Sequence, residues 1–384
     1  MVELLLLLLP VAAASGWMAA KQHYHDQNNE PIPKDYFKGL NFLLNEQPDK
    51  AVEVFIKLLE VNSDTVETHL ALGNLFRKQG EVDRAIRIHQ NLIARPHLAK
   101  AQRNQALFAL AKDYLSAGVL DRSEKLFLDA LEENNRDLDS LHHLLDIYQQ
   151  EKSWEDAIHI TQKLESITGK SKHVEIAHYH CELAEKALQH QEIGQARLFL
   201  KRALTADKCN ARATLLKANM EAGLEHYQAA IHTLEQIKED SPAYFSEAIP
   251  LLVRYHQHLN TETAFIHYLK QHLHACPRIS GAQILAKHFQ AKNPHDAIAY
   301  LTNYIRHHPS LRGLHLLLSL QLRVNPDTET ERINVTLSLL EHIIANNPTY
   351  LCHHCGFSGK TLLWLCPSCK QWNSIKPILG LEGE

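Results

Sequence analysis

Helical segments that recur about every 34 residues constrain the fold of this 384-residue chain more than any other feature. We aligned the small residue expected near the start of the second helix of each unit, and the successive spacings are 34, 38, 34, 39, 34, 34 and 33 residues. The aligned residues are Ala51, Ala85, Ser123, Ala157, Ala196, Ala230, Ala264 and Ala297. Because one pair of helices cannot bury its apolar face alone, such units must stack on one another.

The clearest unit covers residues 70–96 and reads LALGNLFRKQGEVDRAIRIHQNLIARP. Leu72 and Gly73 stand where the first helix packs closely, and Phe76 fills the next turn. Gly80 makes the turn between the helices, and Ala85 lets the second helix approach the first, since tight helix packing needs small residues opposite large ones. This pattern is typical of tetratricopeptide repeats (TPRs).

The predicted fold class is therefore all-α, with a TPR superhelical solenoid of about eight to nine repeats over residues 35–348. The inner groove of such a solenoid is a surface for other protein chains, but the pattern does not identify the residues that contact a partner. Equivalent aromatic positions and the prolines that end units support the assignment; they are Phe42, Tyr114, Tyr148, Tyr255, Pro242, Pro309 and Pro348.

Two spacings exceed the common period. The values of 38 and 39 residues predict extended turns after Pro96 and around Gly169 to Lys172, which we interpret as surface insertions. The stretch after Asn325 fits the period poorly and is expected to form an atypical capping repeat.

Four of the seven cysteines lie within eighteen residues near position 360 and form two CxxC pairs. Two such turns facing each other place four thiolates around one point, which suits a tetrahedral S4 site. We therefore predict a small rubredoxin-like or zinc-ribbon module at residues 349–384 that binds one metal ion. The predicted metal ligands are Cys352, Cys355, Cys366 and Cys369.

Spacing does not separate zinc from iron, and disulfides or a dithiol redox pair are the competing interpretations of the four cysteines. Gly356 provides the backbone freedom of a knuckle turn. His353 and His354 are expected on the surface, because four cysteines already complete the tetrahedron. Trp364 and Trp372 are expected to cover the small module, which has little other apolar material.

The N-terminal run from Leu4 to Ala20 contains seventeen residues without charge. At about 1.5 Å per residue it is slightly short of the roughly 30 Å hydrocarbon core, but a single span is plausible. A cleaved signal peptide and a buried core helix are the alternatives. We predict a transmembrane anchor at residues 1–20 and a juxtamembrane linker at 21–34, with the bulk of the chain in the cytoplasm because Lys21, Lys34 and Lys38 follow the span.

Composition excludes some functions. The net charge of −4 and the absence of a basic block argue against nucleic-acid binding. The sequence contains no HExxH, GxSxG or GxGxxG motif, and Gly169-Lys170-Ser171 lacks the first glycine of a phosphate-binding loop, so it is expected to be a polar turn. The 27 histidines, such as His178, are spread along helices and are expected on the surface or hydrogen-bonded in the core. We therefore predict no catalytic residues and no enzyme activity.

The order of anchor, repeats and cysteine module resembles the lipopolysaccharide assembly protein B (LapB/YciM) family of Gram-negative bacteria essentially from end to end. The segments that carry the resemblance are ELLLLLLPVAAASGW, LGNLFRKQGEVDRAIRIHQ, VEIAHYHCELA and CHHCGFSGKTLLWLCPSCKQWNSIKPILGLEG. Residues 205–345 match in pattern alone, so no partner-contact residue is transferred to them.

The resemblance implies a single-pass inner-membrane adaptor whose cytoplasmic repeats pack against a rubredoxin-type module, with Cys352, Cys355, Cys366 and Cys369 as the metal ligands. Such proteins restrain lipopolysaccharide synthesis by promoting degradation of the lipid A deacetylase LpxC by the membrane protease FtsH. Other lipopolysaccharide assembly proteins are further possible partners. A membrane anchor suits this role, because confinement raises the effective concentration of a substrate near its protease.

Two other functions remain open at this stage. The S4 site could itself be the active element of a rubredoxin-like redox or metal sensor, which the colour of an iron site would reveal. Alternatively, the repeats could serve as a general assembly platform in envelope biogenesis that acts on other partners.

Overall fold

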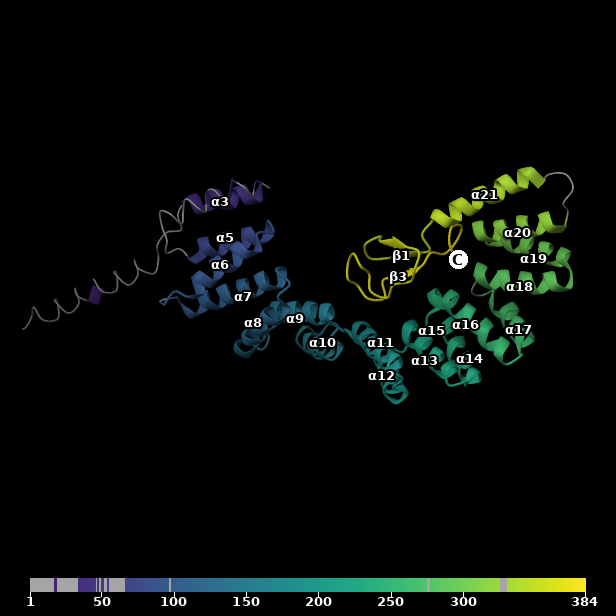
Figure 1. Ribbon diagram of the computed structural model, residues 1–384, viewed down its shortest axis with the longest axis horizontal. Helices are drawn as coiled ribbons and strands as arrows, with labels where there is room; N and C mark the ends of the chain where they lie inside the picture. Colours follow the sequence, from purple (N-terminus) through teal and green to yellow (C-terminus); the bar gives the residue numbers. More distant parts are fainter. Residues whose placement is uncertain are drawn as a thin grey trace, which may run out of the picture. The chain divides into compact units, whose positions relative to one another are not determined.

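The computed structural model describes residues 17–18, 34–45, 47, 50–51, 54, 66–96, 98–274, 277–324 and 330–384. The helices with described bounds lie between Lys34 and Asn346, and three short strands follow (Figure 1). The predicted anchor at residues 1–20 and linker at 21–34 lie outside the described residues, apart from Trp17, Met18 and Lys34. Within the described ranges, no helix has the length and apolar character needed to span a bilayer.

The chain divides into two compact units, Met1–Ile147 and Tyr148–Glu384, and the division falls inside α9. The helices up to this division are α3 (Lys34–Leu44), α5 (Val66–Lys78), α6 (Val82–Ile93), α7 (Lys100–Ser116), α8 (Leu120–Glu133) and α9 (Leu138–Glu151).

The second unit holds the remaining helices and the strands. They are α10 (Trp154–Thr168), α11 (His173–Gln189), α12 (Ile193–Ala206), α13 (Ala211–Gly223), α14 (Tyr227–Glu235), α15 (Ile237–Asp240), η1 (Pro242–Tyr244), α16 (Phe245–His258), α17 (Glu262–His272), α18 (Ile279–Lys292), α19 (Pro294–His307), α20 (Leu311–Val324), α21 (Thr330–Asn346), β1 (Tyr350–Cys352), β2 (Ser358–Gly359) and β3 (Ile375–Pro377).

A buried residue four positions after the N-cap lies near the start of seven second helices of the described chain. These residues are Ala85 in α6, Ser123 in α8, Ala157 in α10, Ala196 in α12, Ala230 in α14, Phe265 in α17 and Ala297 in α19. All but Phe265 are small, which allows the facing backbones to approach closely. Ser123 satisfies its buried hydroxyl by donating a hydrogen bond of 2.8 Å to the carbonyl oxygen of Ala111.

The predicted alignment is wrong in one repeat. Ala264 is exposed, and the buried position belongs to its neighbour Phe265. The Phe265 ring stacks on His256 of α16 with 5.0 Å between centroids. The short elements α15 and η1 precede α16, so this unit departs from the regular helix pair, and choosing the nearest alanine displaced the alignment by one residue.

The long spacings have a different origin from the one predicted. The first helices α7 and α11 each have 17 residues, whereas α5 and α13 have 13 and α9 has 14. The extra residues therefore add about one helical turn. Segment 169–172 is no longer than segment 207–210, so the predicted extended turn around Gly169 is wrong, whereas segment 94–99 around Pro96 is two residues longer than segments 134–137 and 207–210.

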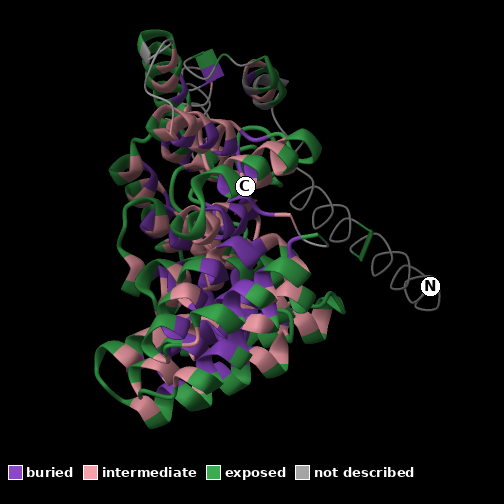
Figure 2. Ribbon diagram, turned by 90° about the vertical axis from the view of Figure 1, so that its right-hand side faces the viewer, coloured by how far each residue is buried: buried purple, intermediate pink, exposed green. Residues whose placement is uncertain are grey.

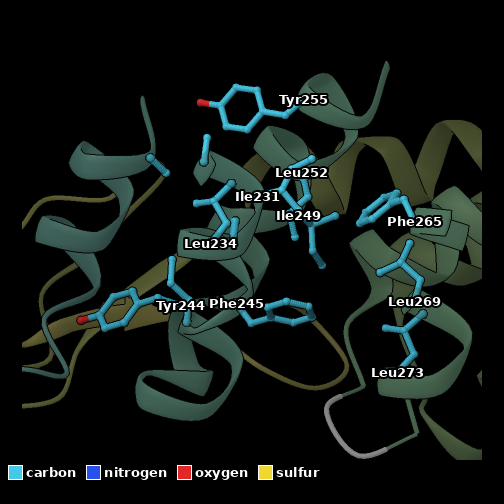
Figure 3. Packing of buried hydrophobic residues seen from close by; sticks show 14 of the residues in the cluster. Ile231, Leu234, Tyr244, Phe245, Ile249, Leu252, Tyr255, Phe265, Leu269 and Leu273 are labelled. Atoms are coloured by element: carbon cyan, nitrogen blue, oxygen red, sulfur yellow. The ribbon is translucent and has the colours of Figure 1, made fainter. Parts of the chain in front are cut away.

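Within each unit the packed helices bury clusters of apolar residues, and exposed residues lie on their outward faces (Figure 2). In the second unit, Ile231 and Leu234 of α14 meet Ile249 of α16, and Leu269 of α17 packs into the same cluster (Figure 3). At about 25 cal/mol per Å² of buried apolar area, such contacts dominate the stability of the array.

A buried polar network lies inside the first unit. Asp113 of α7 forms a salt bridge of 2.8 Å with Arg77 of α5, and its other carboxylate oxygen accepts a hydrogen bond from Nδ1 of His89. Asp113 and His89 are fully buried. Gly73 is required here, because a Cβ atom at this position would lie 2.4 Å from Nε2 of the His89 ring.

We expect Asp113→Ala to destabilise the first unit by about 3 to 5 kcal/mol, because it leaves buried cationic and polar groups without their partner. The change is to be measured by urea unfolding and by hydrogen exchange of α5 and α7. Glu132→Ala removes an exposed carboxylate from α8 and is the matched control, with an expected effect within about 0.5 kcal/mol. Equal effects of the two substitutions would contradict the proposed network.

The corrected repeat alignment makes a second prediction. Ala297→Leu should destabilise the second unit by about 1 to 3 kcal/mol, because a larger side chain overfills a fully buried contact. Ala264→Leu should change stability by less than about 0.5 kcal/mol, because Ala264 faces solvent. Thermal and urea unfolding compare the stability of the two variants directly. A larger loss of stability for Ala264→Leu than for Ala297→Leu would contradict the corrected alignment.

Candidate metal centre

The cysteine segment folds as a small antiparallel sheet in the order β2-β1-β3. Leu351 of the central strand pairs with Ser358 on one side and with Lys376 on the other. The chain therefore turns back immediately after Cys352 and again before Ile375, and both turns bring cysteines to one end of the sheet.

The first knuckle is a tight turn closed by its own backbone. The amide of Cys352 donates to the carbonyl oxygen of Phe357 at 2.7 Å, and the amide of Gly356 donates to the carbonyl oxygen of Cys352 at 3.0 Å. Gly356 has a φ of 79°, a conformation that favours glycine, which agrees with its predicted role.

The second knuckle repeats this geometry fourteen residues later in the sequence. The amide of Cys366 donates to the carbonyl oxygen of Gln371 at 3.0 Å, and the amide of Lys370 donates to that of Cys366 at 2.9 Å. Lys370 has a φ of 56° at the position equivalent to Gly356. The bridge between Leu365 and Trp372 matches the pairing of Leu351 with Ser358, so the two knuckles are related by an internal pseudo-repeat.

The pseudo-repeat brings the four predicted ligands together. The Sγ atoms of Cys352 and Cys369 are 3.8 Å apart, those of Cys355 and Cys366 are 3.6 Å apart, and all four lie within 4.8 Å of one another. Tetrahedral Zn–S bonds of about 2.3 Å separate sulfur atoms by roughly this distance. The arrangement is consistent with one metal ion in an S4 site, and the distances exceed the roughly 2 Å of a disulfide bond.

The surroundings of the cysteine side chains shift their pKa values in different directions. A hydrogen bond with the Ser374 hydroxyl, whose oxygen lies 3.3 Å from Sγ, is the main cause that lowers the pKa of Cys352 to about 5. The backbone amide of Phe357 lowers the pKa of Cys355. Desolvation raises the pKa of Cys369 to about 12, and the neighbouring sulfurs contribute. A bound cation would favour the thiolate form of these groups.

Trp372 joins the module to the helices of the second unit. Its ring stacks on His178 of α11 with 5.0 Å between centroids, and it makes edge contacts with Tyr179 at 5.7 Å and with Trp154 of α10 at 6.1 Å. The Arg212 guanidinium of α13 lies 6.0 Å from the same ring. Trp372 is buried as a result of these contacts.

Trp364, at the other end of the second knuckle, packs against Tyr244 of η1 with 5.3 Å between ring centroids. The Tyr244 hydroxyl points away from the apolar cluster that contains Phe245 (Figure 3), donates to Oδ1 of Asn373 at 2.7 Å and lies 3.0 Å from the carbonyl oxygen of Ile375. Burial raises the pKa of Tyr244, which stays protonated and able to donate.

The segment after β3 adds further contacts. The carbonyl oxygen of Leu381 accepts from the amide of Leu311 at 2.9 Å, and Oε2 of Glu384 accepts from the amide of Ser280 at 3.2 Å. These two amides lie in the first turns of α20 and α18, where helix amides have no partner within the helix, so the segment contributes to capping both helix ends. Arg312 forms a 3.6 Å ion pair with Glu384.

His178 differs from the sequence expectation for histidines. It is fully buried, yet neither ring nitrogen has a hydrogen-bond partner among the described residues. Burial is the main cause that lowers its pKa to about 3, and the nearby Arg212 charge adds to the effect. His178 is therefore neutral at physiological pH and serves as an aromatic surface for Trp372.

The other expectations for this segment have mixed outcomes. His353 and His354 are exposed, as predicted. Trp364 and Trp372 do more than cover the module, because they pack against the repeat helices. Sequence reasoning did not identify Tyr244, whose role depends on a contact between residues more than a hundred positions apart.

Comparisons with known proteins agree with these observations. Residues 350–377 match the family described as a rubredoxin metal binding domain, and residues 68–100 match the tetratricopeptide repeat. The chain is 36% identical over 392 aligned positions to lipopolysaccharide assembly protein B of Escherichia coli (strain K12), and 35% identical over 402 positions to the protein of the same name from Haemophilus influenzae. Both alignments cover 100% of each protein.

Solved helical-repeat structures show a partial likeness. The crystal structure of MamA has a TM-score of 0.33 at 18% identity and covers 44% of this chain and 94% of MamA. The Naa15/Naa10 complex bound to HypK-THB has a TM-score of 0.41 at 13% identity and covers 82% of this chain and 51% of that one. The full-length identity of more than a third to two curated relatives shows that the chain belongs to the lipopolysaccharide assembly protein B family.

Proposed function

We propose that this chain is a non-enzymatic adaptor of the bacterial inner membrane that limits lipopolysaccharide synthesis by bringing the lipid A deacetylase LpxC to the membrane protease FtsH. The full-length match to lipopolysaccharide assembly protein B carries the proposal. TPR-type helix pairs with an integrated metal module support a binding role, because such arrays recognise other proteins through their helix faces.

The proposed domain arrangement assigns residues 1–20 to a single membrane anchor and 21–34 to a linker. Residues 35–348 are the repeat array in the cytoplasm, and residues 349–384 are the metal module. The uncharged run from Leu4 to Ala20 and the lysines that follow it support this topology. An anchor of this kind keeps bound LpxC within reach of a protease in the same membrane.

We assign Cys352, Cys355, Cys366 and Cys369 as the ligands of one zinc or iron ion. The bound ion would neutralise four crowded thiolates and lock the two knuckles together. Its role in this proposal is structural, because Trp372 and Asn373 of the second knuckle carry the contacts to α11 and η1.

One observation favours a second candidate function. Cys355 is exposed and Cys369 is half-buried, so one side of the S4 cluster faces solvent. A redox or metal sensor needs such access for electrons, oxidants or competing ligands. A purified protein with a reducible iron absorption spectrum would support this function, whereas colourless protein with one zinc per chain would count against iron redox chemistry.

We expect Cys366→Ser to lose the metal and to loosen the contact between the module and the helices, because the module buries few apolar residues of its own. Metal per chain by mass spectrometry, tryptophan fluorescence and protease cleavage after residue 348 are the measurements. Cys209→Ser is the matched control, because Cys209 is an exposed cysteine outside the cluster. A Cys366→Ser protein with full metal content and unchanged protease resistance would refute the structural role.

The adaptor function predicts that depletion of this chain lengthens the half-life of LpxC in its own host, measured by pulse-chase. Re-expression of the wild-type chain should restore rapid turnover, and an unrelated FtsH substrate should decay at an unchanged rate. If depletion leaves the LpxC half-life unchanged, the proteolysis mechanism fails, and the general assembly platform becomes the better description.

A further inference from the structure

A groove in the first unit has a composition that suits one kind of ligand. It encloses about 660 Å³ between α5, α7, α8 and the start of α9. Its apolar floor is formed by Leu70, Leu107, Phe108, Leu126 and Ala130. This volume lies in the usual range of binding pockets and accommodates one or two aliphatic side chains.

The rim of the groove is acidic. Asp129, Glu133, Asp137 and Asp139 contribute four carboxylates, and Lys112 is the single basic residue among the described lining residues. Asp137 caps α9 by accepting from the amide of Ser140, and Glu133 pairs with Lys100.

The remaining two acids are available for a ligand. Asp129 and Asp139 are exposed and form no salt bridge within the part of the chain that the structure describes. A ligand with positive charge is therefore favoured over a neutral or acidic one.

Side-chain amides between floor and rim complement a peptide backbone. Oδ1 of Asn74 accepts from Arg77 at 2.7 Å, and the Asn74 amino group has no hydrogen-bond partner among the described residues, so it can donate to a ligand. The amino group of Asn104 donates to Glu133, and its side-chain oxygen, which has no donor within the described part of the chain, can accept from a ligand. A peptide unit offers one acceptor and one donor, so the two amides match its requirements.

The buried network described above holds this surface in place. Arg77 connects the groove residue Asn74 to the buried Asp113 and also donates to the carbonyl oxygen of Ala109, another lining residue, at 3.3 Å. Groups fixed in this way lose little conformational entropy when a ligand binds.

We propose that this groove binds an extended segment of a partner protein that presents aliphatic side chains next to lysine or arginine. The proposal rests on the adaptor function, since the segment belongs to a protein that the array recruits. The apolar floor receives the aliphatic side chain, the amides hold the backbone, and Asp129 and Asp139 pair with the basic residues.

Fluorescence anisotropy with the full-length chain in a neutral detergent tests the proposal with three short capped peptides of equal length. The first peptide carries two leucines flanked by lysines in a glycine and serine background. The second replaces lysine with glutamate, and the third replaces leucine with serine. We expect the first peptide to bind, and each of the other two to bind about tenfold more weakly or less.

The variants locate the binding on the chain. Asp129→Asn with Asp139→Asn should weaken binding of the first peptide about tenfold. Asp83→Asn with Glu132→Gln is the control of equal charge, because Asp83 also lies in the first turn of a helix and Glu132 is also exposed on α8, but neither lines the groove. Asp129→Lys with Asp139→Lys should bind the glutamate peptide better than the lysine peptide.

Three results would overturn the proposal: equal losses in the groove and control variants, full affinity of the serine peptide, or no change of preference after charge reversal. The first two would reduce the binding to general attraction between opposite charges. The outcome is separate from the adaptor function. A normal LpxC response to depletion together with failed peptide binding would exclude this groove and leave the adaptor function intact.

Discussion

The close contact made by one buried residue per second helix is the constraint on which the array depends. Where that residue is Ala85, Ser123 or Ala297, the facing backbones approach closely and the next pair stacks on the same face. The stacking turns one face of α5 and α7 toward a shared groove, so Asn74 of one repeat becomes a neighbour of Asn104 and Phe108 of the next repeat. The close packing of small buried side chains thus determines where the polar residues of the groove lie.

The metal module depends on the array as much as on its metal. Its own buried residues, such as Cys352, Cys366 and Ile375, are too few to stabilise a fold of this size. Its largest buried side chain, Trp372, completes an aromatic cluster with Trp154, His178 and Tyr179 instead. Because these residues belong to α10 and α11, the module shares its aromatic contacts with the interior of the second unit, and a metal bound at the S4 site would be coupled to the order of helices that it does not touch.

The sequence was sufficient wherever the relevant information is local. The period of the repeats, the turn at Gly80, the left-handed Gly356 and the meeting of the four cysteines all follow from residue type and spacing. The alignment assigned Ala264 to the packing position because alanine is small. The buried position is set by its distance from the start of the helix, and Phe265 occupies it. Roles that depend on contacts distant in sequence, such as Tyr244 with Asn373, leave no periodic or spaced signal, and neither do the residues that line the groove.

Asp113 and His178 show how burial and hydrogen-bonding partners decide what a polar residue does. Arg77 and His89 compensate the free-energy cost of burying the Asp113 carboxylate. The rigid network that results orients Asn74 at the surface. His178 has no hydrogen-bonding partner among the described residues, its pKa falls to about 3, and it acts as a flat neutral ring against Trp372. The network around Asp113 supports a polar surface at Asn74, whereas the His178 ring belongs to an apolar junction. The acidic groove therefore acquires its selectivity for basic segments from Asp129 and Asp139 at the rim. The buried Asp113 carboxylate does not contribute, because it is already paired with Arg77.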